Sequence, residues 1–347
     1  MIEFGEVLVT ARRARGLTQE QLAEKAQVTQ AALSRYENDL REPDDEILER
    51  LAEPLGVTAA FLKSAGQVRG GMALEAHMRR RQTAKPTVWR QLEAKLNMYR
   101  MHARLVYEDV AVLAEQSVPR LDPFEVSPEA AARMVRMQWR MPLGPVRNLT
   151  RWIEAAACVV IEEDFGTARV DGLSQWVDDY PVILINRRSP TDRKRLTLAH
   201  ELGHLVLHSV DVSQDMEAEA NNFAAEFLTP ADLIRPQLRT VTTGRLHDLK
   251  REWGVSMQAL VERSYQLRTI KATQRTNLYK SFSAKGWRIK EPLSEELAPE
   301  VPQLVSAIGQ ALAGKGYSAS DVARLAGFSA ETANHPFSPP SHRLRAV

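Results

Sequence analysis

The chain has 347 residues, of which 44% are hydrophobic and 26% are charged, a composition typical of two or three globular domains. No apolar run reaches about 18 residues, and Met1 to Glu6 show neither a basic start nor an apolar signal core, so we expect a cytoplasmic protein without a membrane span. The single cysteine, Cys158, excludes an internal disulfide and a cysteine-rich zinc site.

Residues 1–64 are expected to form a domain of four or five short helices. Thr18 and Thr29 are each placed to cap a helix, and the turn between these two helices falls at Gln27-Val28. Ala23, Val28 and Leu33 would pack between the two helices. Two short helices joined by a tight turn are typical of the helix-turn-helix arrangement.

This domain resembles the Xre/Cro-type helix-turn-helix family, through Gly16-Leu17-Thr18-Gln19, Leu22-Ala23, Val28-Thr29 and Leu33-Ser34-Arg35-Tyr36-Glu37-Asn38 in particular. The resemblance implies that the helix after Thr29 enters the major groove of DNA. Its implied base-facing residues are Gln30, Ala31, Ser34 and Arg35, and its implied phosphate-facing residues are Gln19, Arg12 and Asn38. In that groove, a glutamine side chain can hydrogen-bond to adenine and an arginine side chain can hydrogen-bond to guanine.

The charge distribution leaves an alternative open. Residues 1–64 carry 8 Lys/Arg and 12 Asp/Glu, a net charge of −4, which favours a helical bundle for protein contact because DNA affinity depends on phosphate neutralisation. Residues 65–105 carry 9 Lys/Arg and 2 Glu, a net charge of +7. Arg79-Arg80-Arg81, Lys85 and Arg90 could therefore supply basic charge from outside the domain.

Residues 65–126 read as a basic linker and helical connector, with a long helix from Pro86 to about Glu115. Ser127-Pro128 predicts the start of another helix, and the apolar runs Cys158–Ile161 and Pro181–Asn186 predict strands. The second strand lies directly before the segment described next, where it could hold an extended peptide by edge pairing.

The segment Leu198-Ala199-His200-Glu201-Leu202-Gly203-His204-Leu205 carries a His-Glu-x-x-His pattern in a run that predicts a helix. Residues four apart share a helix face, so His200 and His204 can bind one zinc ion, and Glu201 can act on its water as general base. Ser189 is the expected cap of this helix, followed by Pro190. The small Gly203 suggests that another element packs closely here.

A second helix, Glu217–Leu228, should supply the third ligand. Glu217 and Glu219 are both candidates, and we favour Glu217 because Asn221, one turn further on, could orient His200 or His204. His208 could act behind the ligands or near the oxyanion, but we interpret it first as a packing histidine. The oxyanion donor cannot be assigned from the sequence.

The His200–Leu205 segment, His208 and Glu217–Ala225 resemble the ImmA/IrrE family of metallopeptidases, as do Asp171-Gly172, Ile183–Asn186 and Trp253–Ser256. The likeness runs from about residue 127 to 270 and departs from the family at Phe227-Leu228-Thr229-Pro230. It implies a zinc peptidase that relieves repression by cutting a partner repressor, often one with an Xre-type domain.

The sequence therefore predicts a mostly α protein with a small β-sheet, of α+β class. Its parts would be a helix-turn-helix domain (1–64), a connector (65–126), a zincin-like peptidase (127–270), a C-terminal helical region (271–333) and a disordered tail (334–347). The predicted site comprises Zn²⁺ on His200, His204 and Glu217, the base Glu201, and DNA contacts at Gln19, Thr29, Gln30, Ala31, Ser34, Arg35 and Asn38.

We expect a DNA-associated regulatory peptidase acting on a protein substrate, with no membrane partner. Two alternatives remain: a transcription regulator whose peptidase-like domain is a sensor, and an antitoxin-type interaction module. The C-terminal helices, at about Val301–Leu312 and Ala319–Phe328, could cap the peptidase, bind a partner or form a homodimer contact.

Overall fold

The computed structural model describes residues 3–64, 85–110, 114–177, 179–209, 213–330 and 335–338. The chain divides into two compact units. The first unit comprises Met1–Leu113, Val177–Val182 and Gln303–Val347, and the second comprises Ala114–Trp176 and Ile183–Pro302. The N-terminal and C-terminal parts of the chain therefore share one unit.

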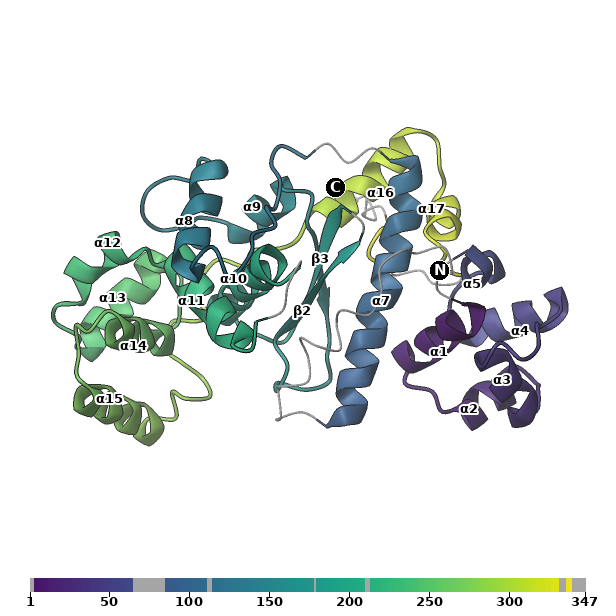
Figure 1. The fold of residues 1–347 in the computed structure, drawn as a ribbon, viewed down its shortest axis with the longest axis horizontal. Helices are drawn as coiled ribbons and strands as arrows, with labels where there is room; N and C mark the ends of the chain where they lie inside the picture. The colour runs from purple at the N-terminus through teal and green to yellow at the C-terminus, as the bar shows by residue number, and fades with distance from the viewer. Residues whose placement is uncertain are drawn as a thin grey trace, which may run out of the picture. The chain divides into compact units, whose positions relative to one another are not determined.

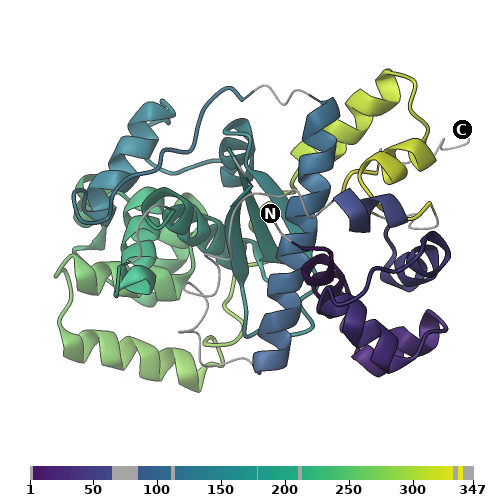
Figure 2. The same ribbon diagram turned by 45° about the vertical axis from the view of Figure 1, so that its right-hand side comes forward.

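The first unit is helical (Figures 1 and 2). Its helices are α1 (Phe4–Ala14), α2 (Gln19–Lys25), α3 (Gln30–Glu37), α4 (Asp45–Leu55), α5 (Ala59–Ser64), α7 (Pro86–Asp109), α16 (Leu304–Gly314) and α17 (Ala319–Leu325). Thr18 and Thr29 cap α2 and α3 as predicted, because each hydroxyl accepts a hydrogen bond from the amide three residues on. Leu33 and Ala23 are buried, and Val28 packs partly buried against them.

The long helix α7 packs along α1, and its residues Ala94, Met98 and Met101 join the core of the helix-turn-helix helices. This helix begins at Pro86 as predicted but ends at Asp109, short of the expected Glu115. Arg79-Arg80-Arg81, and residues 334 and 339–347 of the expected tail, lie outside the described residues.

The chain forms a three-stranded sheet of order β1-β3-β2, from β1 (Val159–Glu163), β2 (Gly172–Val177) and β3 (Tyr180–Asn186). Most of this sheet belongs to the second unit, and Val177–Val182 is assigned to the first. Two of these strands were predicted, whereas β2 was not. The expected edge pairing of a peptide on β3 is wrong, because β3 is the central strand and has a neighbour on each side. Its residues Val182 to Asn186 are all buried.

Helices form the rest of the second unit (Figure 1). They are α8 (Pro128–Gln138), α9 (Leu149–Ala155), α10 (Thr191–Leu207), α11 (Met216–Leu228), α12 (Ala231–Ile234), a 3-10 turn (Arg235–Leu238), α13 (Thr243–Trp253), α14 (Met257–Gln266) and α15 (Ala272–Ala284). The predicted cap Ser127 is present, and Ser256 caps α14. The predicted cap Ser189 is wrong: α10 begins one residue later than expected, with Pro190 at the cap position.

Buried ion pairs hold the far ends of α10 and α11. Near the start of α10, Lys250 contacts Asp192 at 2.7 Å and Glu291 at 2.8 Å, and all three side chains are almost fully buried. Near the end of α11, Arg263 pairs with the buried Glu226. Removing one partner of such a pair leaves an uncompensated buried charge, so these contacts restrict where the two helices can lie.

The chain is mostly helical with a small sheet, which confirms the predicted α+β class. Within the described residues, no helix is both long enough and apolar enough to cross a bilayer.

Candidate metal centre and DNA-reading face

Two helices of the second unit bring three ligand-type side chains together. His200 and His204 lie on α10, Glu217 lies on α11, and one ligand atom of each falls within 4.8 Å of the others. The Nε2 atoms of the two histidines are 3.1 Å apart, and the Glu217 carboxylate oxygens lie 3.6 Å from His200 Nε2 and 3.5 Å from His204 Nε2.

These separations match a tetrahedral zinc site. Ligand atoms about 2.0 to 2.1 Å from a tetrahedral ion must lie roughly 3.3 Å from one another. The two histidine nitrogens and the Glu217 oxygens already have that spacing. Two imidazoles and one carboxylate also form a ligand set that leaves the fourth position open, as hydrolytic zinc sites require.

Close packing of α10 on α11 explains how Glu217 reaches the histidines. A Cβ atom added to Gly203 would lie 3.1 Å from Cδ1 of Phe223 and 3.2 Å from Cα of Ala220, both on α11. Phe223 is fully buried there, so it is a packing residue. The expectation that an element packs closely on Gly203 is confirmed.

Each histidine is held at its other ring nitrogen. His200 Nδ1 lies 3.0 Å from Oδ1 of Asn221, so its N–H can donate to the amide oxygen and leave Nε2 free for a metal. His204 Nδ1 lies 3.0 Å from Nδ1 of His208. Because Asn221 is on α11, the helix that carries Glu217 also fixes the ring plane of His200.

A hydrogen-bonded chain extends behind His204. His208 Nε2 lies 2.8 Å from Glu219 Oε2, and Ser213 Oγ donates to the other Glu219 oxygen at 2.8 Å. Burial lowers the pKa of His208, although the Glu219 carboxylate opposes that shift. His208 therefore contacts a candidate ligand directly rather than only filling the core, and Glu219 points to His208 rather than to the three-residue cluster.

Glu201 lies beside the cluster and is buried. The hydroxyl of Ser174, on β2, donates to Glu201 Oε2 at 2.8 Å. The two residues lie 27 positions apart in the chain, and Ser174 lies on a strand that was not predicted. No local sequence pattern distinguishes Ser174 from its neighbours. Strand β2 thus holds one oxygen of the Glu201 carboxylate in place.

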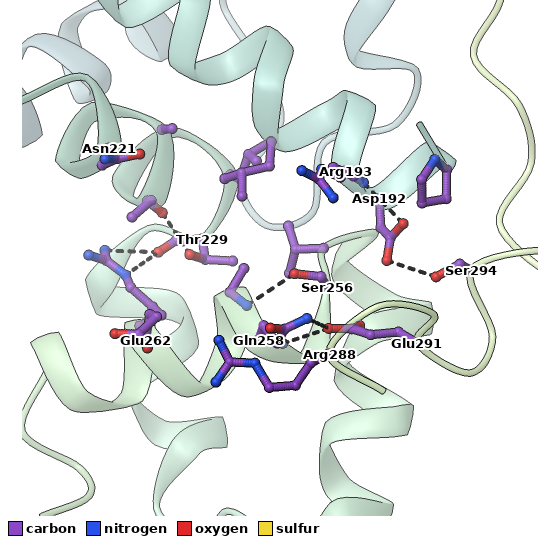
Figure 3. Close-up of a pocket in the computed structure, with 18 of the residues that line it drawn as sticks. Asp192, Arg193, Asn221, Thr229, Ser256, Gln258, Glu262, Arg288, Glu291 and Ser294 are labelled. Carbon is purple, nitrogen blue, oxygen red and sulfur yellow. Dashed lines mark hydrogen bonds between the residues drawn. The ribbon is translucent and has the colours of Figure 1, made fainter. Parts of the chain in front are cut away.

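A cavity of about 670 Å³ lies in the same unit, and its wall includes Asn221, the residue that contacts His200 (Figure 3). Leu196, one turn before His200, and Asn221, one turn after Glu217, both line it. The residues of α10 and α11 that line the cavity therefore lie on the same helix faces as the candidate ligands. Ala225 and Ala259 contribute small side chains to its wall, and Gln258 and Arg288 add polar groups.

In the first unit, α3 presents an exposed face suited to reading DNA. Gln30, Ala31, Arg35 and Asn38 are exposed, and Ser34 is partly exposed. The side chain of Asn38 donates to the carbonyl of Ser34 at 2.7 Å. The hydroxyl of Thr29 is engaged with the amide of Ala32, so this residue sets the start of the helix.

Arg12 and Gln19, which the resemblance places toward phosphates, both contact Glu37. Arg12 donates to Glu37 at 2.5 and 2.9 Å and to the carbonyl of Leu17 at 3.0 Å. Gln19 donates to the same Glu37 carboxylate at 2.7 Å. The buried Glu37 thus connects α1, α2 and α3 through the side chains of Arg12 and Gln19, which are both partly buried.

Comparison with protein families agrees with this geometry. Residues 8–62 match the helix-turn-helix family model, and residues 153–265 match the model described as the IrrE N-terminal-like domain. The chain carries a helix-turn-helix domain followed by an IrrE/ImmA-like peptidase domain. A comparison with curated proteins finds no match. The two matched families point to DNA-binding regulation and to zinc peptidase chemistry, respectively.

Proposed function

We propose that this protein is a DNA-associated regulator that hydrolyses a peptide bond in a partner protein at a zinc centre formed by His200, His204 and Glu217. The observation that carries the proposal is the convergence of the three ligand atoms within 4.8 Å, beside a buried general base. The helix-turn-helix domain on the same chain favours a transcriptional repressor as the partner.

Zinc bound by these residues would polarise the scissile carbonyl and lower the pKa of the attacking water. Glu201 accepts the proton of that water as the water attacks the carbonyl carbon, and then gives it to the leaving amine. The hydroxyl of Ser174, 2.8 Å from Glu201 Oε2, holds the carboxylate in position for both transfers. Asn221 and His208 fix the planes of the two imidazoles.

The cavity whose wall includes Asn221 supports a peptide as the substrate. Its volume, about 670 Å³, is ample for an amino-acid side chain, and its wall includes Leu196 and Asn221, one turn from His200 and Glu217. A peptide bound across the cluster could place one side chain there.

The test uses the whole chain and the variant Glu201→Gln. The variant should retain about one zinc per chain by elemental analysis, because Glu201 is not among the three clustered ligands. It should lose at least about 100-fold in cleavage of a helix-turn-helix repressor encoded by a neighbouring gene, as expected for loss of a general base. Glu252→Gln, an exposed change on α13, is the matched control and should leave both properties unchanged.

Unreduced cleavage by a metal-loaded Glu201→Gln variant would refute the mechanism. A purified wild-type chain that takes up no divalent metal would refute the centre itself. If Glu201→Gln instead supports normal regulation in cells, the peptidase-like domain serves as a sensor and the chain acts through DNA alone.

A further inference from the structure

The C-terminal helices of the first unit repeat the start of its helix-turn-helix domain. Helix α1 spans Phe4–Ala14 and α16 spans Leu304–Gly314, so each has 11 residues. Helix α2 spans Gln19–Lys25 and α17 spans Ala319–Leu325, so each has 7 residues. Every boundary in the second pair of helices lies 300 positions after its counterpart in the first pair.

The turns between these helices also match. Gly16 and Gly316 end the first helix of each pair with positive φ angles of 70° and 93°. Thr18 and Ser318 then cap the second helix, and each cap is part of a reciprocal capping box. Two helices of equal length, joined by the same glycine turn and the same kind of cap, form the same local fold.

The chain leaves the second helix of each pair in the same way. The amide of Val28 donates to the carbonyl of Ala23 at 2.9 Å, and the amide of Phe328 donates to the carbonyl of Ala323 at 2.8 Å. A residue with positive φ precedes each of these amides, Gln27 in one copy and Gly327 in the other. The buried side chains of the two second helices correspond as well: Leu22, Ala23 and Ala26 with Val322, Ala323 and Ala326.

The sequence after the second copy does not predict an equivalent of the full reading helix. The counterpart of α3 would span residues 330–337, and Pro336 occupies the position that corresponds to Tyr36. Proline in a helix interior removes a hydrogen bond and clashes with the preceding turn, so the sequence disfavours a helix as long as α3. The described residues 335–338 lie outside any helix. The family match to helix-turn-helix domains covers residues 8–62 and leaves this copy unassigned.

The turn of the second copy docks on the first copy. The amide of Thr58 donates to the carbonyl of Gly327 at 3.0 Å, and the amide of Ser329 donates to the carbonyl of Gly56 at 3.1 Å. These bonds flank an antiparallel bridge between Val57 and Phe328. Figure 2 shows α16 and α17, in yellow, beside α5 and α7.

An aromatic stack continues this contact into the core of the unit. Phe328 stacks on the ring of His102 with centroids 3.8 Å apart, and Phe61 stacks on the same ring at 4.4 Å. His102 Nδ1 also lies 2.6 Å from the carbonyl oxygen of Ala326. The second copy thus covers Phe61 on α5 and His102 on α7, and both of these residues are almost fully buried.

We propose that residues 304–329 are a truncated second helix-turn-helix copy that does not read DNA. This copy instead binds the first copy within the same chain. It covers a face of α5 and α7 that would otherwise be exposed. The DNA-binding unit is therefore completed by both ends of the chain, and release of the C-terminal copy would open this face.

Two glycines of the second copy provide a matched test in the full chain. A Cβ atom at Gly327 would overlap the ring of Phe61 and lie 3.1 Å from Leu105, whereas a Cβ atom at Gly316 would meet nothing within 4 Å. Both glycines have positive φ, so Gly327→Ala and Gly316→Ala introduce similar local strain, but only the first separates the two copies.

Amide hydrogen exchange of the full chain reports the outcome. In Gly327→Ala, exchange at residues 57–64 should accelerate at least about tenfold relative to Gly316→Ala, and residues 191–207 should be unchanged in both variants. Phe328→Ala, which removes the stack without backbone strain, should give the same pattern. Wild-type exchange at residues 57–64 in both Gly327→Ala and Phe328→Ala, or equal acceleration in Gly316→Ala, would overturn the proposal.

Discussion

The first unit, which contains the helix-turn-helix domain, should lose stability in mild acid because it buries a neutral histidine. Desolvation lowers the pKa of His102 from 6.5 to about 3, and the nearby His335 and Arg15 act in the same direction. The hydrogen bond to the carbonyl of Ala326 opposes the shift. Below pH 6.5 the unfolded chain protonates this histidine while the folded chain does not, so stability falls as the pH falls.

The size of this loss follows from the two pKa values. Between pH 7 and pH 5, a group with a pKa of 6.5 when unfolded and about 3 when folded removes about 2 kcal/mol from the free energy of unfolding. The loss stops growing once the pH falls below about 3. Burial also lowers the pKa of His335, to about 4, which adds to the effect in the same pH range.

Hydrogen exchange of the whole chain can isolate the contribution of His102. Amides that exchange through unfolding of this unit, such as those of α5, should lose about 30-fold in protection at pH 5, beyond the intrinsic pH effect. His102→Asn keeps a donor toward Ala326 but cannot be protonated, so it should be less stable at pH 7 and less sensitive to acid. An identical pH dependence in the wild type and in His102→Asn would show that His102 does not titrate on unfolding.

Three further predictions concern the peptidase unit. Glu219→Gln weakens the support of His208, so zinc affinity in a chelator competition should fall about tenfold; affinity equal to that of Glu252→Gln would contradict this. Gly203→Val forces α10 away from Phe223, so thermal unfolding should show about 1 to 3 kcal/mol of destabilisation together with weaker zinc binding; an unchanged melting temperature would contradict the packing. Ala225→Phe fills part of the cavity, so repressor cleavage should slow while zinc content stays at the wild-type level, and unimpaired cleavage would show that the substrate does not enter there.

Local rules explain what could be read from the sequence. Helix periodicity places His200 and His204 on one face, and the threonine caps define α2 and α3 without reference to any distant residue. Each of these features depends on neighbours within about one helical turn. The sequence therefore determined the helical elements, the paired histidines and the order of the two families along the chain.

Only the tertiary structure decided how these elements meet. Glu217 and Glu219 are both acids in the first turn of α11, and the rotation of that helix against α10 turns the first toward His200 and the second toward His208. The order of the strands makes β3 central and brings Ser174 to Glu201, and Glu37 contacts both Arg12 and Gln19. These outcomes depend on contacts between residues far apart in the chain, which no local spacing encodes.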